Sequence, residues 1–135
     1  MKLRKLTAIL LAIMIMATGA LMTGCGGSGG QAANLEEWMA DTAEGKIMQK
    51  ALESEEDLNV TVEGNCIVMT LTDEEAIDEA TKDDFAAYYE GAYDEMAGDF
   101  EEMTTEIEEL SGLEDITVKI VCVDASGDEF FSKEY

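Results

Sequence analysis

Two segments with the alternation of a β-hairpin constrain the fold of this chain most strongly. The first, DLNVTVEGNCIVMTLT, holds two runs rich in β-branched residues on either side of Gly64-Asn65, a dipeptide typical of hairpin turns. The second alternates from Ile116 onward, turns at DASGDE, and returns from Phe130 to Tyr135. Because an isolated hairpin is marginally stable in water, both hairpins must pack against other elements.

A helical pattern precedes the first hairpin, in NLEEWMADTAEGKIMQKALES. Asn34 with Glu37 three residues later is a capping-box pair, which marks the start of a helix. The apolar residues then change phase between Asp41 and Gly45. We therefore expect either one kinked helix or two short ones, with the glycine absorbing the change.

A second, longer helical pattern separates the two hairpins. It begins after Thr81, ends at Ser111-Gly112, and predicts a single helix of about eight turns. One apolar seam recurs along it at steps of three and four residues, with acidic residues on the opposite face. The seam consists of Phe85, Tyr89, Ala92, Met96, Phe100, Met103, Ile107 and Leu110.

The order helix, hairpin, helix, hairpin predicts the fold class. We expect an α+β domain over residues 34–135, with two helical segments on one face of a four-stranded antiparallel sheet in the order α-β-β-α-β-β. This arrangement buries the apolar sides of both helical segments against the sheet. The pattern leaves the order of the strands open.

The N-terminus has the layout of a secretion signal. Three positive charges lead into an almost purely apolar stretch from Leu6 to Met22, which small residues follow. The sequence Met22-Thr23-Gly24-Cys25 resembles the lipobox of bacterial lipoproteins, in which the cysteine thiol is lipidated and becomes the first mature residue. Cys25 is therefore the predicted lipidation site.

The expected processing divides the chain into three parts: a signal peptide (residues 1–24), a lipidated cysteine with a flexible Gly/Ser tether (25–33), and the domain (34–135). The lipid would hold the protein on the outer face of the cytoplasmic membrane. An uncleaved transmembrane anchor is the alternative, since about 17 apolar residues are just enough to cross a bilayer. The glycine-rich segment after Cys25 favours the processed form.

The composition excludes several classes of function. The chain carries 31 acidic and 8 basic residues, a formal net charge of −23, and no histidine. Such a charge repels nucleic acids and anionic lipid headgroups, whereas a cationic protein, peptide or metal ion would be attracted. The absence of histidine removes the commonest general base and the commonest metal ligand. We therefore expect no nucleic-acid partner, no cofactor and no enzymatic activity.

Two cysteines and one acidic turn are candidate sites. Cys122 alternates in phase with the apolar residues of its strand, whereas Cys66 is out of phase with those of its own. We therefore expect the two thiols on opposite faces of the sheet, although the extracytoplasmic location permits a disulfide. The acidic residues around Gly127 faintly resemble a calcium loop, and an ordinary hairpin turn is the alternative.

Three aromatic residues are candidates for a protein-binding surface. Trp38 lies in the first helical segment, and Tyr88 and Tyr93 lie off the predicted seam of the long helix. The more economical interpretation places them at the rim of the core. Their alternative role is contact with a partner protein.

Three stretches, LEEWMADTAEGK, VEGNCIVMTLT and VDASGDEFFSKEY, resemble a family of small Gram-positive, largely gut-bacterial lipoproteins known as a domain of unknown function. The resemblance spans roughly Leu35 to Tyr135 and implies a shared αββαββ fold, without an activity to carry over. With the anchor and tether, it favours a lipid-anchored extracytoplasmic module that binds a protein or peptide. The alternative is an acidic surface protein that binds calcium or a similar cation.

Overall fold

A computed structural model describes residues 32–52 and 58–135 of the chain. The predicted signal peptide and the predicted lipidation site Cys25 lie outside the described residues. Among the residues described, no helix is both long enough and apolar enough to cross a membrane.

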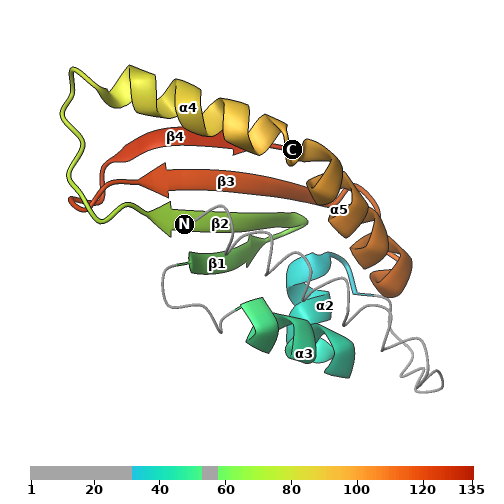
Figure 1. The fold of residues 1–135 in the computed structure, drawn as a ribbon. Coiled ribbons are helices and arrows are strands. Elements are labelled where there is room, and N and C mark those ends of the chain that lie inside the picture. The colour runs from blue at the N-terminus through green and yellow to red at the C-terminus, as the bar shows by residue number, and fades with distance from the viewer. Residues whose placement is uncertain (1–31, 53–57) are drawn as a thin grey trace.

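The described chain is a mixed α/β structure of four helices and four strands (Figure 1). The element order is α-α-β-β-α-α-β-β, because each predicted helical segment consists of two helices. In chain order the elements are α2 (Leu35–Asp41), α3 (Ala43–Leu52), β1 (Leu58–Glu63), β2 (Cys66–Thr72), α4 (Lys82–Asp94), α5 (Ala97–Ser111), β3 (Thr117–Val123) and β4 (Glu129–Glu134).

The four strands form one sheet in the order β1-β2-β3-β4. Both predicted hairpins are present, because β1 pairs antiparallel with β2 and β3 with β4. The central strands β2 and β3 are parallel, so the prediction of a purely antiparallel sheet is wrong. The reason lies in the connection: α4 and α5 carry the chain back across the sheet, and a return of that length allows β3 to start beside the start of β2.

The register of the central strands aligns the apolar residues on one face. Ile67 lies beside Val118, Met69 beside Ile120, and Leu71 beside Cys122. All six side chains are buried, and they join residues from the four helices in a single core. On the other face of the same strands the residues are half-buried or exposed, as the alternation of side chains in a strand requires.

The first helical segment is two short helices. Asn34 caps α2 as predicted, accepting a 2.9 Å hydrogen bond from the backbone N–H of Glu37. Thr42 separates the helices: its hydroxyl donates to the carbonyl of Trp38 (2.7 Å) and accepts from the N–H of Gly45 (2.9 Å). The change of phase in the sequence therefore marks a real break.

The predicted single long helix is also wrong, because it breaks at Glu95 and Met96 into α4 and α5. Gly91 and Gly98 flank the junction and lower the helix propensity on both sides of it. The break frees the two halves to follow different parts of the sheet, with α4 along β4 and α5 against β3 (Figure 1). Phe85, the first residue of the predicted seam, is 42% exposed and meets the ring of Phe130 edge-on at 6.5 Å. The other seven residues of the seam are buried or half-buried, so the seam itself is confirmed.

A β-bulge in β4 allows two adjacent phenylalanines to contact α4. Cys122 lies opposite Phe131 and Val123 lies opposite Glu129, so Phe130 is an extra residue in β4. Both phenylalanines then reach the tyrosines of α4: the ring centroids of Phe130 and Tyr89 are 5.4 Å apart, and Phe131 stacks on Tyr93 at 5.8 Å. Strict alternation would have turned one of the two rings away from the helix.

Candidate functional site

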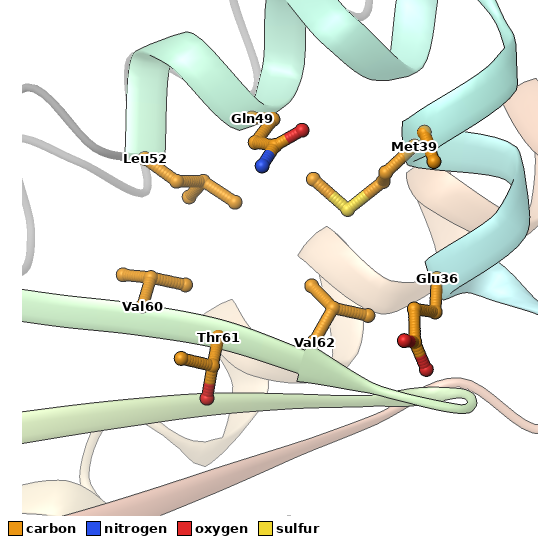
Figure 2. A pocket seen from close by; sticks show the side chains of 8 residues that line it. Glu36, Met39, Gln49, Leu52, Val60, Thr61 and Val62 are labelled. Atoms are coloured by element: carbon orange, nitrogen blue, oxygen red, sulfur yellow. The ribbon is translucent and has the colours of Figure 1, made fainter.

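A groove of about 340 Å³ lies between the α2-α3 pair and strand β1 (Figure 2). We call it the β1 groove. Its lining residues are Glu36, Met39, Ala40, Gln49, Leu52, Val60, Thr61 and Val62.

The two long sides of the β1 groove are largely apolar. Val60 and Val62 are half-buried on β1 and point toward the α2-α3 pair, as Figure 2 shows. Met39 and Leu52 face them from the helices, with the Gln49 amide between. Apolar walls with a few polar groups are typical of sites that bind small molecules or single side chains of a partner.

Glu36 lies at one end of the β1 groove, where the hairpin turn is tied to the start of α2. Its backbone N–H donates to the carbonyl of Gly64 (3.0 Å), and its carboxylate accepts from the N–H of Gly64 (3.2 Å). Gly64 has a φ of +61°, the left-handed conformation that favours glycine. The neighbouring Asn65 side chain accepts from the N–H of Leu35 (2.9 Å) and donates to the carbonyl of Glu114 (3.0 Å). Four hydrogen bonds therefore hold this end of the groove, which carries an exposed carboxylate.

The backbone of β1 forms one border of the groove. Among the described residues, β2 is the only strand that pairs with β1, so β1 is an edge strand. Val60, Thr61 and Val62 all line the groove although Thr61 points away from it in Figure 2. Side chains of consecutive strand residues point to opposite faces, so all three can line one cavity only if it runs along the edge of the strand. The β1 groove therefore reaches the edge of β1. Edge strands present N–H and C=O groups to which another chain can pair.

The three aromatic residues predicted as an interaction surface lie in different places. Tyr88 is 69% exposed on α4, whereas Trp38 is 6% exposed and Tyr93 is fully buried. Tyr93 receives a hydrogen bond from the thiol of Cys122 (3.8 Å), and burial raises the pKa of its phenol. Burial and the hydrogen bond to Asp73 likewise raise the pKa of Tyr89, to about 12. The structure therefore does not bring these three residues together on one surface.

The two thiols lie on opposite faces of the sheet, as the phase of their strands predicts. Cys122 is buried on the helix side, whereas Cys66 is half-buried on the other side and lies opposite Thr117 of β3. A disulfide between Cys66 and Cys122 would have to pass through the sheet, so the geometry excludes it.

The acidic turn between β3 and β4 uses its central carboxylate for structure. Asp124 is buried and accepts backbone hydrogen bonds from Ile77 (3.1 Å), Asp128 (3.0 Å) and Ser126 (2.9 Å). These N–H groups hold the pKa of Asp124 below its ordinary value. Its contribution to stability is therefore present at neutral pH and lost as the pH falls through that lowered pKa. Within residues 32–52 and 58–135, no group of three or more Asp, Glu or Cys residues could hold a metal ion.

The sequence did not reveal the β1 groove. Val60 and Val62 show the expected alternation, but alternation does not indicate that β1 is an edge strand beside a pair of helices. Glu36 was one of many acidic residues, and its contact with Gly64 depends on the way α2 packs on the turn. The available signal was the phase change in the first helical segment, because the break at Thr42 sets α3 beside β1.

Comparison with known proteins gives a family and no activity. Neither a curated protein nor a solved structure matches the chain. A family model, described as a domain of unknown function (DUF4854), matches residues 35–135, which include every described helix and strand. This chain therefore belongs to the DUF4854 family.

Proposed function

We propose that this protein is a lipid-anchored, extracytoplasmic module that binds a protein or peptide. The observation that carries the proposal is the β1 groove, which joins apolar walls, an exposed carboxylate and the backbone of an edge strand. Each of these features suits a polypeptide partner. Its apolar side chains would contact the walls, a basic side chain would pair with Glu36, and its backbone would pair with the edge strand.

The charge of the chain favours a cationic partner. At a net charge of −23, the protein attracts basic peptides and repels nucleic acids and other acidic surfaces. Electrostatic attraction raises the rate at which the protein meets a partner of opposite charge. Added salt screens this attraction and weakens it.

The anchor half of the proposal rests on the lipobox-like sequence that ends at Cys25. We expect intact-mass spectrometry of the protein extracted from bacterial membranes to give a chain that begins at Cys25 and carries lipid. The variant Cys25→Ala removes the thiol that accepts the lipid, so its product should lack this mass. A membrane-extracted chain that retains residues 1–24 would contradict the proposal and indicate a transmembrane anchor.

The binding half can be tested by selecting partners for the full chain in detergent micelles. The probe is a random dodecapeptide library displayed on phage, screened at low salt and again at physiological salt. We expect peptides rich in lysine or arginine that bind saturably and in a salt-dependent way. A library that yields no saturable peptide, or only peptides that a control protein of equal charge binds equally well, would overturn the proposed function.

A further inference from the structure

We infer that the partner binds as an added β-strand, in extended form along the outer edge of β1, with alternate side chains in the β1 groove and a basic residue against Glu36. This inference rests on the proposed function and specifies its site and the conformation of the bound segment. Three independent observations support it: the strand edge, the alternation along it, and the charge at one end.

The edge of β1 has the backbone groups for strand addition. β1 extends over six residues from Leu58 to Glu63, about 20 Å at 3.3 Å per residue, and has β2 on its inner side. The α2 N-terminus bonds to Gly64, just beyond the strand, so it closes one end of the edge. A segment of about six residues therefore fits beside β1.

The side chains of an added strand would alternate between two environments. Those on the same side as Val60 and Val62 would enter the β1 groove and contact Met39 and Leu52. Those on the side of Thr61 would stay in solvent, because Thr61 and its neighbours Asn59 and Glu63 are exposed. The edge therefore selects peptides with apolar residues at every second position.

Charge determines which kind of segment binds. Glu36 is exposed and, among the residues that the structure describes, is the only charged one that lines the groove. A second copy of this chain would bring another acidic molecule to the same edge, and two such surfaces repel each other. A segment with lysine or arginine near the Gly64 end instead gains a charge-assisted hydrogen bond to Glu36.

Backbone pairing can be tested with the peptides selected from the dodecapeptide library. Methylating alternate backbone nitrogens removes the N–H donors along one edge of a peptide and keeps every side chain. We expect methylation along the pairing edge to weaken binding by about tenfold or more, since two or three hydrogen bonds are lost. Methylation of the opposite set should change the affinity little. Equal affinity of both methylated forms and the parent peptide would overturn strand addition.

The location can be tested by matched variants of the full chain. Ala40 is an exposed residue of the groove, and Ala43 is exposed outside it, so Ala40→Trp should reduce peptide affinity more than tenfold and Ala43→Trp should leave it unchanged. Glu36→Gln keeps an acceptor for Gly64 but removes the charge, and we expect about a fivefold loss. Glu44→Gln removes the same charge outside the groove and should have less effect.

The results distinguish failure of this inference from failure of the proposed function. Saturable peptides whose affinity is the same for Ala40→Trp and Ala43→Trp would place binding elsewhere and overturn the inference alone. A chain that forms a symmetric dimer through β1 in solution and excludes the peptides would also overturn it. Loss of binding with Ala40→Trp, at an unchanged melting temperature, supports it.

Discussion

Replacing Tyr93 with alanine should lower the free energy of unfolding by about 3–5 kcal/mol, the usual cost of emptying a large aromatic site in a core. Tyr93 is fully buried on α4, and its ring stacks between Tyr89 at 6.0 Å and Phe131 of β4 at 5.8 Å. The substitution therefore removes the contact that joins the helix to the outer strand. Urea denaturation monitored by circular dichroism measures the change.

Tyr88→Ala is the matched control, because it removes the same side chain from the preceding turn of α4. Tyr88 is 69% exposed, so we expect a change within about 0.5 kcal/mol. Similar effects of the two substitutions would contradict the packing of α4 on the sheet. A large effect of Tyr88→Ala alone would mean that the helix faces the sheet with its other side.

Gly45→Ala should destabilise the protein by about 2 kcal/mol or more, since the new methyl group has no space. A Cβ at Gly45 would overlap the Cα of Met39 and the carbonyl oxygen of Trp38, both backbone atoms of α2. The two helices would have to move apart, and the hydrogen bond from Gly45 to Thr42 would be strained. Thermal and urea denaturation of the full chain measure the loss.

The same substitution at Gly91 or Gly98 should have the opposite sign. Both glycines lie in helices, and a Cβ at either position meets nothing within 4 Å. We therefore expect a gain of up to about 1 kcal/mol for Gly91→Ala or Gly98→Ala, because alanine is the better helix former. A stabilising Gly45→Ala would show that α2 and α3 do not approach as closely as described.

The local elements could be read from the sequence because alternation and capping act over few residues. The hairpin at Gly64-Asn65, the cap at Asn34, and the opposite orientation of Cys66 and Cys122 are all present. Each depends on neighbours in the chain or on the phase of one strand.

The errors concern features that depend on distant residues. Alternation is the same in parallel and antiparallel strands, so the parallel pairing of β2 with β3 could not be read from it. The predicted seam leaves out Tyr93, which is the buried residue of α4, and begins at Phe85, which is 42% exposed.

The β1 groove could not be predicted for the same reason. It needs an edge strand and a pair of helices beside it, and both follow from the strand order. The sequence pointed to a binding role only through charge and the predicted anchor, and the aromatic residues that it suggested include two that the core buries.

Amide hydrogen exchange of the full chain in detergent micelles, with and without a selected peptide, tests strand addition most directly. Pairing of the peptide with β1 would slow exchange of the outward N–H groups between Leu58 and Glu63. Strand β4, from Glu129 to Glu134, is the other edge of the same sheet and should exchange as before. Slower exchange in β4 instead of β1, or no change in either strand while the peptide is bound, would contradict the account.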